Sequence, residues 1–242
     1  MTAPLIITAL GLILLIPFLI KRVKGACAEA AVLKSIVSIG FIATAVAAII
    51  SNNLSGIQLK FGILILGGLV FGLLGDIWLD LKYAHKESEK TYMYAGMICF
   101  ILGHLMYVVN IFWYFYPLIA SRVKWNDTLT LFGVPIASAI FMMFSEKPMK
   151  VNYGQYKAVT TVYAMFLSAL PAIALIFMRL AGYKNIPLIF LGAASIFFVI
   201  SDFILTGTYF GKGKDRPVDI IVNHITYYIA QYLIALSLCF LK

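Results

Sequence analysis

Long apolar runs alternate with short polar connections along the whole chain. Eight of these runs are close to the roughly 20 residues that an α-helix needs to cross the hydrocarbon core of a bilayer. They fall at about 4–20, 30–50, 61–81, 92–116, 128–145, 157–179, 186–210 and 218–241. Because backbone polar groups in lipid must be satisfied internally, each run predicts a helix. The pattern therefore predicts an all-α polytopic membrane protein, a bundle of eight transmembrane helices.

The connections between the runs are short and rich in turn-forming residues, such as Asn52-Asn53 and the segment 182–187. None is long enough for a soluble domain, so we expect a single domain, residues 1–242. Cations follow the first run rather than precede it, which favours a retained first helix over a cleaved signal peptide.

Composition supports a bilayer environment. The chain is 62% hydrophobic and 12% charged, with a mean hydropathy of +0.97, whereas soluble domains are about half apolar and about 25% charged. The net charge of +9 does not indicate a nucleic-acid partner, because the cations form short clusters between apolar runs, as membrane flanks do. The cysteines Cys27, Cys99 and Cys239 have no paired or metal-type spacing and are expected to be apolar filler.

Lysine and arginine are unequally shared between the two sides of the predicted bundle. The connections after the first, third, fifth and seventh runs hold thirteen: Lys21, Arg22, Lys24, Lys34, Lys82, Lys86, Lys90, Lys147, Lys150, Lys157, Lys212, Lys214 and Arg216. The other three connections hold five: Lys60, Arg122, Lys124, Arg179 and Lys184. Lys242 ends the chain. Because cytoplasmic connections carry the excess of cations, we expect both termini to be non-cytoplasmic, in the cell membrane if the protein is bacterial.

Two of the predicted helices contain carboxylates. Asp76 lies in "FGLLGDIWLDL" (71–81) and Asp202 in "FFVISDFIL" (197–205). An ionisable group in a span costs about 2.5–3.5 kcal/mol on insertion scales and normally faces the bundle interior. Counted from the cytoplasmic ends of their runs, Asp76 is roughly 8 Å deep and Asp202 roughly 12 Å deep. This depth suits chemistry on a lipid's glycerol linkage better than a transport site at the midplane.

A purely structural role is the alternative for each carboxylate. Both aspartates are candidates for a packing hydrogen bond or a salt bridge to Lys34. Asp80 continues the spacing of four from Gly68 and Gly72 through Asp76, so it shares their face. Asp80 is also close to the interface, where simple solvation would explain it.

Helical spacing places further polar side chains on inward faces. These are Tyr107 with His104 beside it, Tyr163, and Asn223, Tyr227 and Gln231 with His224 beside them. A packing hydrogen bond is the ordinary alternative for a single His or Tyr in a span. Two carboxyls in an apolar pocket cannot easily both ionise. One is then expected to keep its proton, which is the division that acid–base catalysis needs.

Other common site chemistries lack support. The sequence has no G-x-S-x-G, H-E-x-x-H or P-loop motif, so serine hydrolase, zinc peptidase and NTPase activities are not indicated. No metal-ligand pattern accompanies the two carboxylates. We expect neither a metal nor a cofactor.

Four stretches together resemble the signatures of the YhhN family, whose vertebrate members are lysoplasmalogenases. They are "GDIWLDL" (75–81), "GHLMY" (103–107), "FFVISDFIL" (197–205) and "TYYIAQYLIALS" (226–237). Their order along the chain is more specific than any one of them. The resemblance implies an eight-span enzyme that hydrolyses the vinyl ether bond of lysoplasmalogen. The products would be a fatty aldehyde and glycerophosphoethanolamine or glycerophosphocholine, and no cofactor is implied.

The resemblance also implies which residues form the site. The family's polar positions fall on Asp76, His104, Tyr107, Ser201, Asp202, Tyr227, Tyr228 and Gln231, with Lys34 as a further match. We expect Asp76 and Asp202 to be catalytic and the others to bind or orient the lipid, in a site that opens toward the cytoplasmic leaflet. Asp202 is expected to be the acid and Asp76 the base or stabiliser, with the reverse as the alternative. Supporting roles are expected for Asp80, Tyr163, Asn223 and His224, although the family pattern includes neither Asp80 nor His224.

Two other functions remain open. A proton- or cation-coupled transporter would use Asp76 and Asp202 as relay groups and would turn over no lipid. In a non-catalytic lipid-binding protein, replacing either aspartate would change stability alone. The expected partners are a lysophospholipid substrate and the bilayer, and the sequence does not indicate an oligomeric state.

Overall fold

The computed structural model describes residues 2–212 and 216–241, so the cations counted at Lys214 and Lys242 lie outside the described residues. The long helices are α1 (Thr2–Val23), α2 (Cys27–Ser51), α3 (Gly56–Ala84), α4 (Glu89–Ile119), α5 (Trp125–Phe144), α7 (Lys157–Leu180), α8 (Ile186–Phe210) and α9 (Pro217–Ser237). Within the described ranges, eight helices are long and apolar enough to cross a membrane. The predicted fold class is therefore confirmed, and the chain is an integral membrane protein.

Most of the long helices extend past the apolar runs that predicted them. Helix α3, predicted at 61–81, begins at Gly56 and ends at Ala84. A helix ends where its backbone hydrogen bonding is interrupted, not where its side chains become polar. The turn before α3 contains Asn53, whose φ of 48° is left-handed, and α3 begins at Gly56, whose φ is 52°. The short helix α6 (Glu146–Met149), in the connection between α5 and α7, was not predicted.

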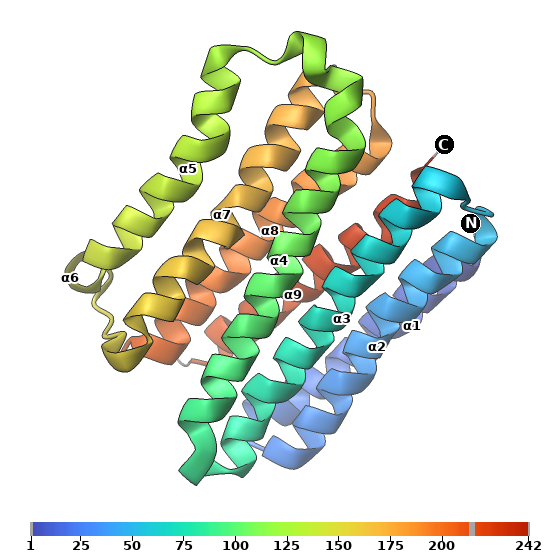
Figure 1. Ribbon diagram of the computed structural model, residues 1–242. Coiled ribbons are helices and arrows are strands. Elements are labelled where there is room, and N and C mark those ends of the chain that lie inside the picture. The colour runs from blue at the N-terminus through green and yellow to red at the C-terminus, as the bar shows by residue number, and fades with distance from the viewer. Residues whose placement is uncertain (1, 213–215, 242) are drawn as a thin grey trace.

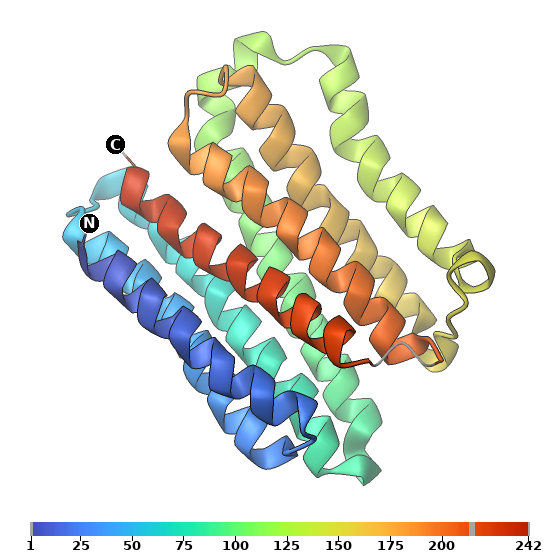
Figure 2. The ribbon, with the colours of Figure 1, turned by 180° about the vertical axis from the view of Figure 1, so that it is seen from behind.

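Helix α9 lies at the centre of the arrangement. It packs against α8 on one side and against α1, α2 and α3 on the other, which places the α1–α2 hairpin beside it (Figure 1). The first and last helices bring the N- and C-terminal ends close together at one end of the bundle, as the reverse view also shows (Figure 2). Which side of the membrane that end faces stays a prediction.

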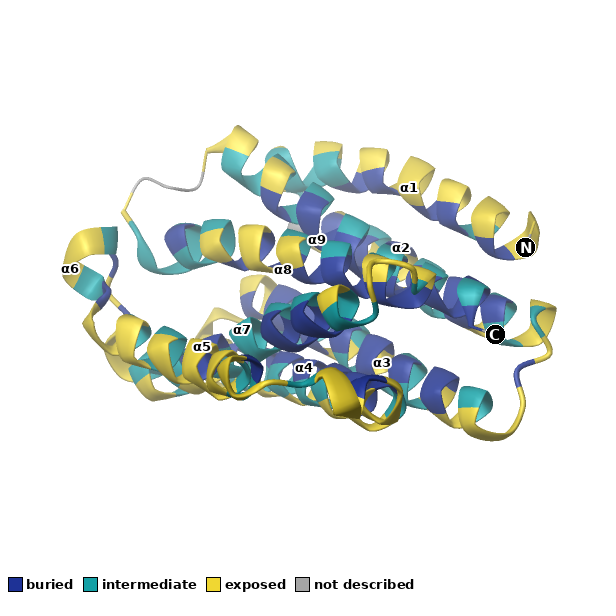
Figure 3. Ribbon diagram, turned by 90° about the horizontal axis from the view of Figure 1, so that it is seen from above, coloured by how far each residue is buried: buried dark blue, intermediate teal, exposed yellow. Residues whose placement is uncertain are grey.

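Helix α5 is peripheral. It packs mainly against α7, and Figure 3 colours most of its length as exposed or intermediate. An ion pair between Arg179 and Asp127 and a hydrogen bond from Arg122 Nη1 to the carbonyl of Leu180 (2.9 Å) attach one of its ends to α7. Its apolar outer surface therefore faces lipid.

The bundle interior changes character along α3. Phe61, Ile65 and Leu69, near the end that holds the chain termini, are fully buried among apolar neighbours. Asp76 and Asp80 are buried two to three turns further along. The polar interior therefore lies toward the end of the bundle where α1 turns into α2.

Candidate active site

A glycine-lined face of α3 makes room for the polar side chains. A Cβ atom on Gly68 would lie 2.2 Å from the ring of Tyr107, and one on Gly72 would lie 2.5 Å from the amide nitrogen of Gln231. Both distances are far below van der Waals contact. The predicted inward stripe of glycines and carboxylates is therefore present, and the absence of side chains at its glycines lets α4 and α9 approach α3.

Three hydrogen-bond donors surround the carboxyl of Asp76. Its Oδ1 is 3.1 Å from Lys34 Nζ. Its Oδ2 accepts hydrogen bonds from Ser38 Oγ (2.7 Å) and from the Tyr227 hydroxyl (2.8 Å). The Tyr227 hydroxyl in turn accepts from Gln231 Nε2 (3.0 Å). The carboxyl of Asp76 accepts from three donors and donates no hydrogen bond to any of them. This is the bonding pattern of an ionised carboxylate.

Asp80 is also buried in an ion-pair network. Its side chain is 6% exposed. It pairs with Arg22 through one oxygen, and its other oxygen is 3.4 Å from Lys34 Nζ. Solvation, the alternative that the sequence left open for Asp80, is therefore excluded. Lys34 bridges the two carboxylates of α3, so the salt bridge considered as an alternative for Asp76 is present.

Asp202, on α8, has a much sparser environment. It is 7% exposed, and its Oδ2 accepts a hydrogen bond from the Tyr163 hydroxyl at 2.6 Å. Among the described residues, no Lys, Arg or His lies within ion-pair distance of it. The two candidate catalytic carboxyls therefore differ sharply in the cations that surround them.

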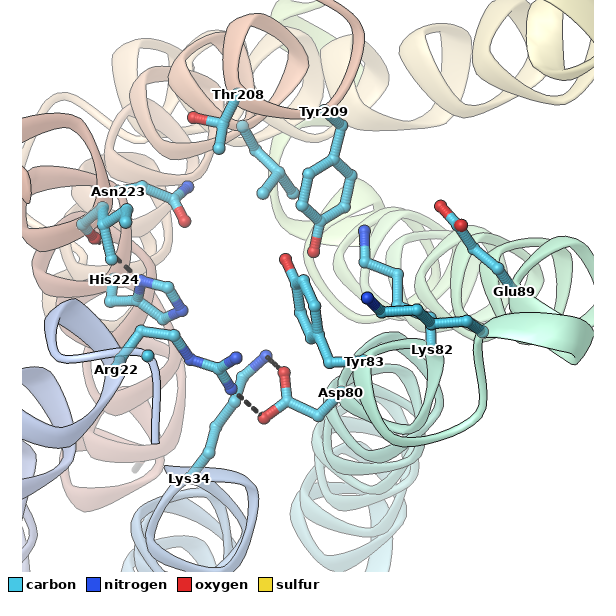
Figure 4. Close-up of a pocket in the computed structure, with 14 residues that line it drawn as sticks. Arg22, Lys34, Asp80, Lys82, Tyr83, Glu89, Thr208, Tyr209, Asn223 and His224 are labelled. Atoms are coloured by element: carbon cyan, nitrogen blue, oxygen red, sulfur yellow. Dashed lines mark hydrogen bonds and ion pairs between the residues drawn. The ribbon is translucent and has the colours of Figure 1, made fainter. Parts of the chain in front are cut away.

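Three neighbouring cavities connect these groups. The largest, here named the vestibule, has a volume of about 600 Å³ (Figure 4). Its polar lining includes Arg22, Lys34, Asp80, Lys82, Tyr83, Lys86, Glu89, Tyr209, Asn223 and His224. A junction cavity of about 30 Å³, room for about one water molecule, is lined by both Asp76 and Asp202. Lys34 lines both the junction cavity and the vestibule.

The third cavity is apolar and lies on the other side of Asp202. It has a volume of about 40 Å³ and shares Asp202, Leu79 and Phe100 with the junction cavity. Met142 of α5 also lines it. Leu205 and Tyr209 line all three cavities, so these cavities adjoin one another. The cavities therefore follow one another from the charged vestibule, through the junction cavity with its two carboxyls, to the apolar cavity.

A family model described as the YhhN family matches residues 30–238. The chain belongs to the YhhN family. The match contains every candidate site residue predicted from the sequence, and the resemblance drawn from the four motifs is confirmed. No curated protein and no solved structure matches the chain. Among the described residues of this YhhN protein, no three His, Cys, Asp or Glu side chains come together as metal ligands would.

Several residues of the YhhN pattern form a supporting layer. Ser201 donates to the backbone carbonyl of Asn223 (3.2 Å), and Asn223 Nδ2 donates back to the Ser201 carbonyl (2.8 Å), which joins α8 to α9. Tyr228 donates to the Lys34 carbonyl (3.1 Å). Tyr107 donates to the side-chain Oε1 of Gln231 (3.2 Å). Direct contact of these residues with a substrate stays a prediction.

Neither predicted histidine contacts a carboxyl of the site. His104 bonds through Nδ1 to the Phe100 carbonyl (2.8 Å), and its ring packs edge-on against Tyr163 at 5.7 Å. Its Nε2 is buried and has no partner in the described parts of the chain. His224 bonds to the Ile220 carbonyl (2.8 Å) and lines the vestibule and the junction cavity. His104 thus lies behind the tyrosine that bonds Asp202.

Sequence reasoning gave no individual site role to Arg22, Ser38 or Lys82 of this YhhN chain. Arg22 and Lys82 had been counted as membrane-flanking cations. Ser38 had a usable signal, because it follows Lys34 by four residues and must share its helix face. The pairing of Arg22 with Asp80 depends on which helices become neighbours, and the sequence pattern does not give that.

Proposed function

We propose that this protein is a membrane hydrolase that cleaves the vinyl ether bond of a lysoplasmalogen-type lysophospholipid. The products would be a fatty aldehyde and the glycerophospho-headgroup. The observation that carries the proposal is that Asp76 and Asp202 line one small cavity between a charged vestibule and an apolar space. The substrate has the same order of polarity: a phosphate headgroup, then glycerol, then the ether bond, then a hydrocarbon chain.

Asp202 is assigned the role of general acid. An ionised Asp202 would be a buried charge without a cation, and such a charge is costly in an apolar bundle. Its protonated carboxyl would give its proton to the β-carbon of the vinyl ether. The double bond then supplies the electron pair for the new C–H bond, and an oxocarbenium ion forms at the carbon attached to the ether oxygen. General acid catalysis of this kind contributes about 10²–10⁴-fold.

Asp76 is assigned the role of stabiliser and base. An ionised carboxylate has about four acceptor positions, and donors from the described residues occupy three of them at Asp76. The remaining position is available to a water molecule. As the water oxygen bonds to the oxocarbenium carbon, Asp76 takes the proton that water loses, and a hemiacetal results. Paired carboxylates divide acid and base roles in the same way in glycoside hydrolysis.

Collapse of the hemiacetal would restore both carboxyls. The hemiacetal hydroxyl returns a proton to Asp202 as the aldehyde C=O bond forms. The bond to the glycerol oxygen breaks, and Asp76 gives this oxygen the proton taken from water. The sum is one lipid and one water giving one aldehyde and one glycerophospho-headgroup, without an oxidant or a reductant.

Neighbouring groups hold the two carboxyls in place. Tyr227 and Ser38 fix the Oδ2 atom of Asp76, which directs its other oxygen toward Lys34. Tyr163 orients Asp202, and His104 packs against the Tyr163 ring. We further propose that the vestibule opens toward the cytoplasmic leaflet, because lysines and arginines concentrate at its end of the bundle.

The test is incubation of the purified protein with a lysoplasmalogen and, separately, with its saturated 1-O-alkyl analogue. Aldehyde release from the vinyl ether alone is the expected result. Asp76→Asn and Asp202→Asn should each reduce release to background while the protein stays folded. Full activity in both single variants would exclude the two-carboxylate mechanism.

The same preparation separates the rival functions. Absence of aldehyde from both lipids, together with proton flux in liposomes that depends on Asp76 and Asp202, would favour a transporter. If both lipids bind without turnover or flux, the protein is a lipid-binding protein and not an enzyme.

A further inference from the structure

Lys82 is a buried cation without a carboxylate partner. It is 7% exposed and lines the vestibule. Its Nζ lies 3.3 Å from the sulfur of Met93 and 3.3 Å from the centroid of the Tyr209 ring. Among the described residues, no Asp or Glu oxygen lies within 4.0 Å of it. Lys34, which lines the same vestibule, is by contrast held by two carboxylates.

The two lysines come from different helices, Lys34 from α2 and Lys82 from α3, and they differ in how their charge is balanced. Lys34 Nζ is 3.1 Å from Asp76 and 3.4 Å from Asp80. Lys82 has a thioether and an aromatic face instead. A buried charge is normally paired or coordinated, and a cation–π contact offsets only part of its desolvation cost. The ammonium of Lys82 therefore has no carboxylate partner within ion-pair distance among the described residues.

A second vestibule cation also has unused hydrogen-bonding capacity. Arg22 lines the vestibule, and its side chain pairs with Asp80 through Nη2. Its Nε is a buried donor without an acceptor in the described parts of the chain. Arg22, Lys82, Tyr83 and Tyr209 all line the vestibule, and Figure 4 shows the two tyrosine hydroxyls facing one another between Arg22 and Lys82.

The charges around this space do not cancel. The vestibule is lined by Arg22, Lys34, Lys82 and Lys86, which carry four positive charges, and by Asp80 and Glu89, which carry two negative charges. Asp76, which contacts Lys34 from the junction cavity, adds a third negative charge. Four minus three leaves one positive charge, which a monoanion such as a phosphodiester would neutralise. The volume of about 600 Å³ is within the usual range for a ligand pocket.

We propose that Lys82, assisted by Arg22, binds the phosphodiester of a glycerophospholipid headgroup in the vestibule. The proposal rests on the proposed function for the position of the lipid, with its ether bond at the junction cavity. Six residues of α3 separate Asp76 from Lys82, a rise of about 9 Å. The glycerol unit, which joins the ether bond to the phosphate, would lie along this stretch of α3.

The test measures binding rather than turnover. The ligand is a saturated 1-O-alkyl lysophospholipid, which keeps the phosphodiester and has no vinyl ether, and the reference ligand is the matching 1-O-alkylglycerol, which has no phosphate. Affinities are measured by calorimetry in detergent micelles and phosphate-free buffer. Lys82→Met should weaken binding of the phospholipid at least about tenfold, the scale of a hydrogen bond to a charged group, and leave binding of the alkylglycerol unchanged. Lys82→Arg should retain the affinity.

Lys90→Met is the matched control. Lys90 is an exposed lysine near the start of α4 that does not line the vestibule, so its removal changes the net charge equally and should leave both affinities unchanged. Equal weakening by Lys82→Met and Lys90→Met would overturn the proposal, because general attraction would then explain the binding. Inorganic phosphate alone is the second probe. Tight, Lys82-dependent binding of inorganic phosphate would assign the site to free phosphate and overturn the lipid headgroup assignment.

A melting experiment distinguishes a binding role for Lys82 from a structural one. Removal of an unpaired buried charge is expected to leave the Tm of the ligand-free protein unchanged or raised. A lower Tm with unchanged phospholipid affinity would show that Lys82 is structural. Lys82-dependent binding without hydrolysis of lysoplasmalogen would reject the proposed function alone. Hydrolysis with affinity independent of Lys82 would reject the headgroup site alone.

Discussion

Asp76 and Asp202 are the same residue type, both are buried and both line the junction cavity, yet their surroundings are opposite. Asp76 receives a lysine ammonium, a serine hydroxyl and a tyrosine hydroxyl. Asp202 receives a tyrosine hydroxyl, with no ion pair in the described ranges. Depth in the bundle therefore does not separate the two carboxyls. What distinguishes them is the Lys34 ammonium, which α2 brings to Asp76 and which has no counterpart at Asp202 among the described residues.

The difference follows from helix packing. Helix α3 packs against α2, which brings Lys34 and Ser38 to Asp76. Helix α8 packs against α7 and α9, and α7 contributes Tyr163 to Asp202. If the two carboxyls have the separate roles proposed here, exchanging or removing their neighbours should affect them unequally.

The largest expected effect comes from neutralising each aspartate in turn. Asp76→Asn and Asp202→Asn should both lower aldehyde release by about 10²–10⁴-fold. Their effects on stability should differ. Asp76→Asn removes one partner of a buried ion pair and should cost about 3 kcal/mol of unfolding free energy, whereas Asp202→Asn should cost less than about 1 kcal/mol. Unfolding in micelles measures both, and equal losses of stability would contradict the contrast between the two sites.

A double-mutant cycle tests whether Lys34 is the cause of the difference. Lys34→Met leaves the carboxylate of Asp76 without its cation and should destabilise the protein by about 3 kcal/mol. Adding Asp76→Asn should restore part of this loss, because Arg22 and Asp80 remain paired. We expect a coupling energy of about 1–3 kcal/mol from the four unfolding curves. Additive effects of the two substitutions would show that the ion pair does not stabilise the fold.

Gly72→Ala should perturb the surroundings of Asp76 without removing any charge. The new methyl would meet Gln231 Nε2, which bonds the Tyr227 hydroxyl beside Asp76. Overpacking of this kind costs about 1–3 kcal/mol. Gly133→Ala on α5 is the control, since its Cβ would meet open space. Unfolding curves and aldehyde release should change for Gly72→Ala and not for Gly133→Ala.

Tyr163→Phe should affect Asp202 with a small effect on stability. It removes the hydrogen bond that Asp202 accepts from α7 and keeps the ring that packs against His104. We expect a stability change of about 1 kcal/mol and a clear loss of aldehyde release. A loss of stability as large as that of Asp76→Asn would contradict the view that Asp202 has few structural contacts.

The smallest effect is expected at the half-buried ion pair of Lys157 and Glu146, which gives a scale for the fully buried pair. A hydrogen bond from Lys157 and one from the backbone N–H of Tyr153 hold the pKa of Glu146 below its ordinary value. For a carboxyl with a lowered folded-state pKa, the stabilisation is complete above the ordinary pKa of about 4.3 and is lost as the pH falls through the folded-state pKa. The Tm of Glu146→Gln should therefore be slightly below that of the unchanged protein near neutral pH and approach it in acid. A difference that does not depend on pH would show that ionisation of Glu146 is not the cause.

Much of the fold was predictable because lipid leaves the backbone few alternatives. The hydrophobic runs predicted all eight spanning helices, and spacing along α3 predicted that Gly68, Gly72, Asp76 and Asp80 face inward. The helix ends were less accurate, because apolarity does not mark the residue at which a helix stops. The candidate pair Asp76 and Asp202 could be predicted because a carboxyl in a membrane span has a free-energy cost, and such residues are usually retained for a function.

Most neighbours of these carboxyls were not predictable, although the salt bridge between Lys34 and Asp76 was one of the alternatives considered. Arg22 and Lys82 were interpreted as membrane-flanking cations, although Arg22 pairs with Asp80 and Lys82 lines the vestibule. Hydrophobic patterns give the inward face of each helix but not the helices that this face meets. For Asp80 the sequence left solvation open beside an inward-facing position, and in the structure Arg22 and Lys34 pair with its buried carboxylate.

The ion-pair network also bears on how the chain enters the membrane. Arg22 lies on α1 and Lys34 on α2, whereas Asp76 and Asp80 lie on α3, and their four charges sum to zero only when these three helices are together. A single aspartate at the centre of an inserting helix costs about 2.5–3.5 kcal/mol. Synthesis from the N-terminus delivers both cations before either carboxylate. We therefore expect α3 to insert efficiently only next to the completed α1–α2 hairpin, so that the biogenesis of the bundle depends on the order in which its charges leave the ribosome.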